Sequence, residues 1–143
     1  MIPPPPPSFS LPARTPTITA GYHGHLATVR ELLSRGAPLE AVRFDGTSPL
    51  FVAAEAGRAE VVAELLARGA AVDAANLNGA TPLYAACLKG HADVVALLVA
   101  KGAALDAATR FGWTPLLASV AKGNQEVVCA LLAPQVVTLH TGD

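Results

Sequence analysis

The sequence predicts an all-α solenoid, a stack of short helical hairpins that share one continuous core. Its strongest signal is a five-residue block that recurs every 33 residues without insertion or deletion, at residues 46–50, 79–83 and 112–116. A fixed period of this length is typical of stacked repeat proteins. Hydrophobic residues make up 52% of the chain but aromatic residues only 5%, so Ala, Val and Leu must fill the core. A solenoid presents an extended surface, which favours holding a macromolecule over converting a small one.

Composition excludes several classes of function. The 143 residues suit one domain, and ten Lys and Arg against eleven Asp and Glu give a net charge of −1 without the basic patch of a nucleic-acid-binding protein. No apolar run approaches the ~20 residues that a membrane helix needs, so no membrane insertion is expected. Two cysteines and no secretory signal at the N-terminus predict an intracellular, most simply cytoplasmic, protein.

Residues 1–12 form a proline-rich leader with five consecutive prolines, Pro3 to Pro7. Proline lacks the backbone N–H that helices and sheets require, so the leader is expected to be polyproline II or disordered. Two interpretations stay open: a stiff solvated spacer, or a ligand for an SH3, WW or profilin-like domain.

The repeat register then runs through residues 13–133 and divides them into four copies, 13–45, 46–78, 79–111 and 112–133, followed by a C-terminal tail at 134–143. The first and last copies are degenerate. The first keeps Thr15-Pro16, Gly24-His25 and Leu32-Leu33 in register with the second copy.

Local chemistry predicts two short helices in each copy. Ser48, Thr81 and Thr114 are N-cap residues, each followed by a proline at the first helical position. Glycines should end both helices, at residues 57, 90 and 123 for the first and at 36, 69 and 102 for the second. The pairs Asp45-Gly46 and Asn78-Gly79 predict hairpin turns that lead into the next copy. Helices of eight or nine residues do not persist alone, so stacking must stabilise them.

With these features in place, the chain closely resembles the ankyrin repeat family, through Gly-x-Thr-Pro-Leu, Ala-Ala, Gly-His, Val-Val, Leu-Leu and Gly-Ala within one 33-residue unit. The resemblance covers residues 13–133 and implies an ankyrin-repeat solenoid of four repeats that binds a partner protein through a concave face of hairpin tips and first helices. Carried onto this chain, the implied partner-binding residues are Phe44, Asp45, Thr47, Leu77, Asn78, Ala80, Arg110, Phe111 and Trp113 at the tips, and Glu55, Leu88, Lys89 and Lys122 on the helices.

The chain departs from the family pattern at several places. The family often has His after Thr-Pro-Leu, where this chain has Phe51, Tyr84 and Leu117, so the loop network should be looser or replaced by packing. Thr17 and Gly21 stand at apolar positions of the first helix, which should therefore be frayed, and Pro134 should end the last helix abruptly.

Neither end of the array carries a polar cap. Val127, Val128, Leu131 and Leu132 keep the internal apolar pattern in the last copy, so the ends should leave apolar surface bare. We predict weak self-association through these ends, or that the chain is a piece of a longer repeat array.

No catalytic or metal site is expected. Glu40, Asp73 and Asp106 recur once per copy, but adjacent copies should be ~8–10 Å apart, too wide for a retaining carboxylate pair, so loop hydrogen bonding explains them better. His23-Gly24-His25 supplies two ligands where a stable metal site needs three or four. Cys87 should be inert core and Cys129 more exposed.

The sequence therefore predicts a protein-interaction module that needs no cofactor. The alternatives are a structural or targeting segment of a larger protein and, from another class, an enzyme or small-molecule binder.

Overall fold

The computed structural model describes residues 16–132 of the chain, and these residues fold into helices and loops, with no strand among them. The helices in chain order are α1 (Pro16–Tyr22), α2 (Leu26–Ser34), α3 (Pro49–Ala56), α4 (Ala59–Ala67), α5 (Pro82–Lys89), α6 (Ala92–Ala100) and α7 (Pro115–Ala121), followed by a last helix at residues 125–132. The predicted all-α solenoid is confirmed. The leader at 1–12, the tail at 134–143 and the predicted helix stop at Pro134 lie outside the described residues.

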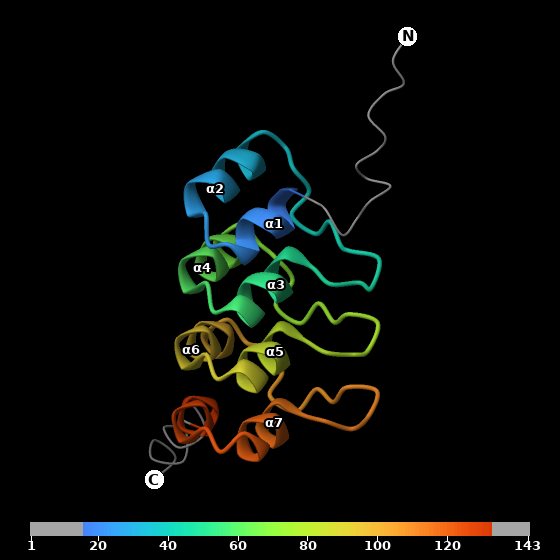
Figure 1. Ribbon diagram of the computed structural model, residues 1–143, viewed down its shortest axis with the longest axis vertical. Coiled ribbons are helices and arrows are strands. Elements are labelled where there is room, and N and C mark those ends of the chain that lie inside the picture. The colour runs from blue at the N-terminus through green and yellow to red at the C-terminus, as the bar shows by residue number, and fades with distance from the viewer. Residues whose placement is uncertain (1–15, 133–143) are drawn as a thin grey trace.

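The helices stack in two columns (Figure 1). The first helices α1, α3, α5 and α7 follow one another along the long axis and each contacts the next, while α2, α4 and α6 form the second column. The loops between copies project to one side, beyond the column of first helices. The stack therefore has one face built from the first helices and the hairpin loops.

Each first helix from α3 onward begins at the predicted cap. The side-chain oxygens of Ser48, Thr81 and Thr114 accept hydrogen bonds from backbone N–H groups three residues later, at 3.1, 3.2 and 3.1 Å. Proline follows each cap at the first helical position, where its missing N–H leaves no bond unmade. The repeated start is thus encoded locally, as predicted.

The first helices end close to the predicted glycines. Gly57 and Gly90 cap α3 and α5 in the left-handed conformation, with φ of 76° and 80°. In α7 the cap is Lys122, and Gly123 follows it at φ 67°. A left-handed residue turns the chain back for the second helix, and glycine adopts that conformation without steric strain.

Aliphatic side chains from both columns fill the core. Leu50, Leu65, Leu83 and Leu98 are buried completely or nearly so, together with the valines that precede the leucines on α4 and α6. Burying each such side chain contributes ~1.5–3 kcal/mol, which helices this short cannot obtain alone. Packing between copies therefore stabilises the fold, as the sequence indicated.

The expectation that the first helix is frayed is wrong, because α1 spans Pro16–Tyr22 and packs against α3. Thr17 and Gly21, the two residues that suggested fraying, are both buried. A Cβ on Gly21 would lie 3.7 Å from Cγ1 of Val61 and 4.0 Å from Cβ of Ala53. These are ordinary van der Waals distances, so Gly21 lies in the packed interface between the first and second copies.

The loops are joined to one another by backbone hydrogen bonds. The N–H of Leu77 donates to the carbonyl of Asp45 at 2.9 Å, and the N–H of Arg110 donates to the carbonyl of Asn78 at 2.9 Å. Packing replaces the family's histidine where Phe51 lies against Ala80 and Ala85 of the next copy in a small apolar cluster. The hairpin tips are thus fixed relative to one another.

Candidate functional site

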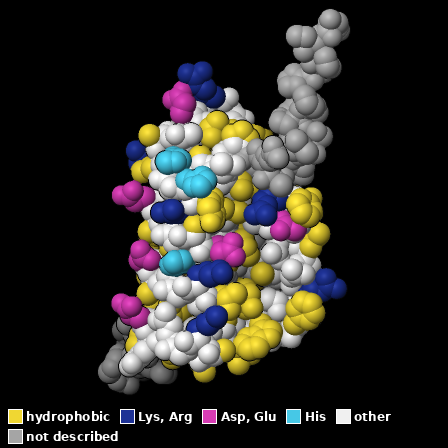
Figure 2. Space-filling model, in the orientation of Figure 1, with side chains coloured by type: hydrophobic (Ala, Val, Ile, Leu, Met, Phe, Trp, Pro, Cys, Tyr) yellow, Lys and Arg dark blue, Asp and Glu magenta, His cyan; other side chains and the backbone are white. Residues whose placement is uncertain are grey.

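The hairpin tips expose large apolar side chains. Phe44 is 73% exposed, Leu77 71% and Phe111 75%, one on each of three successive loops. The guanidinium of Arg110 lies 5.5 Å from the centre of the Phe111 ring, a cation–π contact that leaves both side chains at the surface. Figure 2 shows apolar side chains along the edge where the loops lie. Neither phenylalanine folds back over the preceding loop.

Polar groups brace each hairpin from within. Oδ1 of Asp45 accepts from the N–H of Thr47 at 3.0 Å, and Oδ1 of Asn76 accepts from the N–H groups of Asn78 and Ala80 at 2.9 and 3.1 Å. Partial burial raises the pKa of Asp45, but the hydrogen bonds from Thr47 and the charge of Arg43 outweigh it and hold the pKa below its usual value. The ionised carboxylate therefore stabilises the turn.

Two of the residues assigned to the tips are not available at the surface. Thr47 is 3% exposed, and Ala80 is 6% exposed and packs against Phe51 of the preceding copy. Trp113 occupies the same place in the 33-residue register, yet it is 43% exposed. Trp113 lies at the end of the described stack, where no further hairpin follows among residues 16–132.

The ends of the first helices carry charged residues beside a shallow hollow. Glu55 and Lys89 line this hollow together with Tyr22 and Arg58, and its volume is about 380 Å³. Nε of Arg58 donates to the carbonyl of Tyr22 at 2.9 Å. Of the other residues assigned to these helices, Leu88 is half-buried and Lys122 is exposed.

A repeated contact joins the turns between the paired helices. Nε2 of His91 lies 3.0 Å from the carbonyl oxygen of Glu55, and because a carbonyl can only accept, Nε2 carries the proton. The ring of His91 covers Gly57 of the preceding copy, as the side chain of Arg58 covers Gly24. These contacts join the turn of each copy to that of the next.

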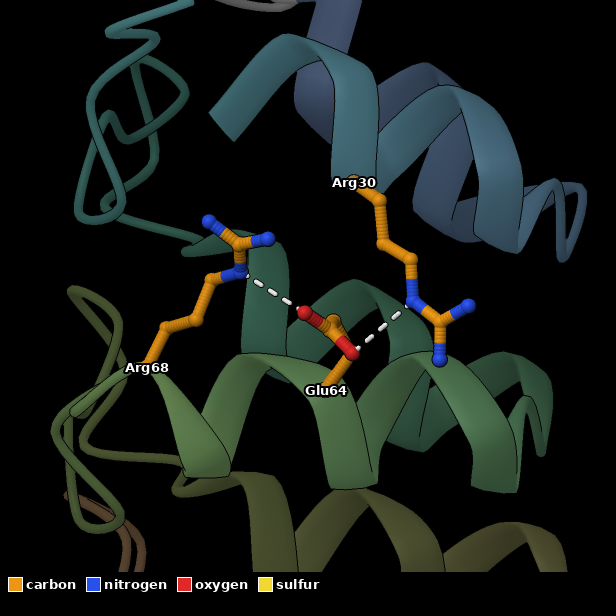
Figure 3. Close-up of polar contacts among 3 residues, drawn as sticks. All are labelled: Arg30, Glu64 and Arg68. Carbon is orange, nitrogen blue, oxygen red and sulfur yellow. Dashed lines mark hydrogen bonds and ion pairs between the residues drawn. The ribbon is translucent and has the colours of Figure 1, made fainter. Parts of the chain in front are cut away.

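An ion-pair network links the first two copies through their second helices, α2 and α4 (Figure 3). Nε of Arg30 on α2 lies 3.1 Å from Oε1 of Glu64 on α4, and Nε of Arg68 lies 2.7 Å from Oε2 of the same carboxylate. The hydrogen bond from Arg68, followed by that from Arg30, lowers the pKa of Glu64. The sequence analysis missed this network, although the i,i+4 spacing of Glu64 and Arg68 was a visible signal.

The recurring acids form loop hydrogen bonds where the structure shows their partners. Oε2 of Glu40 accepts from the N–H of Ala71 at 2.7 Å, and Oδ1 of Asp73 accepts from the N–H of Ala104 at 3.0 Å. Each acid thus caps the loop of the next copy, 31 residues further along the chain. The predicted structural role is confirmed for these two, and Asp106 is exposed at the end of the stack.

The remaining candidate groups for chemistry are separate from one another. The rings of His23 and His25 stack with their centres 5.9 Å apart, and within residues 16–132 no three His, Cys, Asp or Glu side chains gather as a metal site. Cys87 is buried and Cys129 exposed, both as free thiols. Burial raises the pKa of the Cys87 thiol to about 12, so it stays protonated and unreactive.

The bare apolar surface at the end of the array lies mainly on α7 rather than on the last helix, where it was expected. Of the four residues assigned to it, Val127 and Leu131 are almost completely buried, while Val128 and Leu132 are half-buried. The exposed residues are Leu116, Leu117 and Val120 on α7, at 37%, 49% and 59%. Shifting the buried positions of α5 by 33 residues would have identified Leu116 and Val120, whereas Leu117 corresponds to the half-buried Tyr84.

Comparison with known proteins agrees with this architecture. None of the curated proteins compared with the chain matches it. None of the helices in the described part has the length and apolar character needed to cross a membrane. A family model for ankyrin repeats in three copies matches residues 8–76 and again 69–140, which together take in nearly the whole sequence. The chain belongs to the ankyrin repeat family.

Proposed function

We propose that this protein binds a partner protein through one continuous face, built from the hairpin tips and the exposed ends of the first helices. Ankyrin repeats are generally protein–protein interaction modules, so the binding of another protein is the family's ordinary role. What is specific to this chain is the set of side chains that would carry the contact.

The observation that carries the proposal is the exposed row of Phe44, Leu77 and Phe111. Large apolar and aromatic side chains are the groups from which interface hot spots are most often built, and Arg110 beside Phe111 adds a planar donor of the same kind. A monomeric surface seldom gathers such side chains at the tips of loops.

The rigidity of the loops supports the same proposal. Backbone hydrogen bonds tie the tip of each hairpin to the next, through Leu77 to Asp45 and through Arg110 to Asn78. Loops fixed before binding lose little conformational entropy when the partner arrives, which strengthens binding for a given contact area.

Charged residues flank the apolar row and set the polarity of the face. Glu55, Lys89 and Lys122 lie along the ends of the first helices, so the partner should offer charges of both signs around an apolar centre. We place this binding inside the cell, since the chain has only two cysteines and one of them is buried, which is usual for proteins of a reducing compartment.

The test is a binding comparison between tip variants and a matched control. A triple variant Phe44→Ser, Leu77→Ser, Phe111→Ser removes the row from positions that are already exposed, so the helices should remain intact by circular dichroism. Val120→Ser removes an apolar side chain that is 59% exposed at the end of the stack and serves as the control.

Immobilised wild-type chain and both variants would be exposed to the same lysate, and captured proteins identified by mass spectrometry. We expect proteins that bind the wild type and Val120→Ser but not the triple variant, with affinity reduced at least ~100-fold, since three hot-spot side chains at ~1 kcal/mol or more each are lost. Capture that does not change in the triple variant would refute the proposal.

A further inference from the structure

The end of the stack at α7 presents a face that is buried at every other level of the array. Phe51 contacts Ala80 and Ala85 of the next copy, and Gly21 lies against Ala53 and Val61 of the next copy. The side chains at these register positions therefore point towards the following repeat. In α7 the corresponding residues are Leu117 and Val120.

Burial changes sharply at these positions. Leu50 and Leu83 are 1% and 0% exposed, whereas Leu116 in the same register is 37% exposed. Cys87 is completely buried, whereas Val120 is 59% exposed. Among residues 16–132 no side chain covers them. The helix α7 thus carries the surface that in the other copies packs against the following repeat, and in the described residues no repeat follows it.

The exposed side chains form a continuous apolar surface, which we call the end face: Trp113, Leu116, Leu117 and Val120. Three of them lie on α7 at the i, i+1 and i+4 spacing that places side chains on one side of a helix. Beside them a hollow of about 180 Å³ is lined by Leu105, Leu131 and Leu132 together with Leu116. Figure 2 shows apolar side chains gathered at this end of the molecule. An exposed apolar face of this kind marks a site where another surface binds.

The opposite end of the stack does not match the end face. Val52, Ala85 and Ala118 face the preceding copy and are buried at 0–2% exposure. Thr19 holds that register position in α1 and is exposed. Laying the apolar end face on this polar residue would bury less apolar area than laying it on an identical apolar face, which disfavours head-to-tail stacking of chains. The end face is better suited to an identical face.

The charges at the two ends of α7 specify how two such faces would meet. Asp106 lies beside Thr114 and Leu116 at the start of α7, where all three line the same hollow. Lys122 caps the other end of the helix. Both are exposed. Antiparallel pairing of two α7 helices brings Lys122 of each chain over Asp106 of the other, whereas parallel pairing brings like charges together.

We infer that a second copy of this chain docks on the end face, by antiparallel pairing of the two α7 helices around a twofold axis, with Lys122 of each chain paired to Asp106 of the other. An isologous contact of this kind closes on itself and yields a dimer rather than a filament. The dimer leaves the exposed tips Phe44, Leu77 and Phe111 of both chains free, and of the residues in the proposed binding face it uses Lys122.

The first experiment is sedimentation equilibrium of the full chain and its variants over a concentration series. The wild type is expected to dimerise. Val120→Asp should raise the dissociation constant about 100-fold or more, because a twofold axis applies each substitution twice. Leu77→Asp is the control: it places the same charge at an exposed tip and should leave the dimer unchanged. A wild-type monomer at every concentration, including one whose own tail covers the end face, would overturn the inference.

Charge reversal tests the antiparallel geometry. Lys122→Asp alone sets two carboxylates against each other at both ends and should weaken the dimer by roughly tenfold. Adding Asp106→Lys in the same chain restores opposite charges across the axis and should restore the dissociation constant. A double variant that remains as weak as the single one would overturn the proposed pairing.

A distance measurement gives an independent answer. Cys129 is exposed on the last helix while Cys87 is buried, and the chain has no other cysteine, so a nitroxide attached to the folded protein labels one site per chain. Any dipolar coupling between labels then comes from two copies. We expect one defined distance distribution that Val120→Asp abolishes. Absence of coupling in the wild type at concentrations above the measured dissociation constant would contradict the dimer.

Discussion

Replacing Gly57 with alanine should destabilise the protein through two separable effects. The residue has φ of 76°, and a Cβ there would lie 2.6 Å from Cε1 and Nδ1 of the His91 ring in the next copy. Gly123 provides a matched control. Its φ is 67°, but nothing lies within 4 Å of the position its Cβ would take. The two substitutions therefore share the backbone strain and differ in the contact.

The magnitudes follow from these geometries. Placing a Cβ in the left-handed region costs ~1–2 kcal/mol at either position. At Gly57 the imidazole of His91 must also swing away, which breaks its 3.0 Å hydrogen bond to the carbonyl of Glu55. A lost hydrogen bond of this kind costs ~1 kcal/mol. We expect the free energy of unfolding to fall by ~2–3 kcal/mol for Gly57→Ala and by ~1–2 kcal/mol for Gly123→Ala.

Urea denaturation followed by circular dichroism at 222 nm measures both values. A double-mutant cycle with His91→Ala isolates the contact, because without the ring Gly57→Ala should cost no more than Gly123→Ala. Equal losses for the two single variants in the presence of His91, or no coupling in the cycle, would refute the reasoning that the ring of one copy closes over the turn of the previous one.

Two further predictions concern ionisable groups. Glu64 has a folded-state pKa below its ordinary value of 4.5, so its contribution to stability is complete above pH 4.5 and disappears as the pH falls through the folded pKa. The wild type should therefore unfold at a higher urea concentration than Glu64→Gln at pH 7, and this difference should vanish in acid. A difference that does not depend on pH would contradict the ion-pair network. Cys129 should react with an aromatic disulfide reagent at pH 8 in the folded protein. Burial raises the pKa of Cys87 to about 12, so this thiol should react only after urea is added. Two thiols that react equally fast in the native state would show that the core around α5 is open.

Much of the fold could be predicted because the sequence features that determine its helices act over a few residues. A Ser or Thr cap followed by proline begins each first helix, since the hydroxyl accepts the N–H three residues later wherever the chain is placed. The apolar stripes recur with the same period, so the side chains that bury together could also be identified. The family followed from the same residues.

Local patterns were less informative about the surface. Thr47, Ala80 and Trp113 share one register position and were all expected at the tips, yet only the tryptophan is exposed. Tertiary packing buries the other two, and Ala80 lies against Phe51 of the preceding copy. Fraying of α1 was expected from Thr17 and Gly21, and packing against the second copy reversed it.

The sequence by itself thus determined the repeat, its helices and the aliphatic core, because caps, glycines and apolar spacing act within a few residues of where they stand. Only the tertiary structure decided which of the repeated positions reach the surface. Exposure depends on whether a neighbouring copy lies above or below, and so identical register positions are buried at Cys87 and bare at Val120.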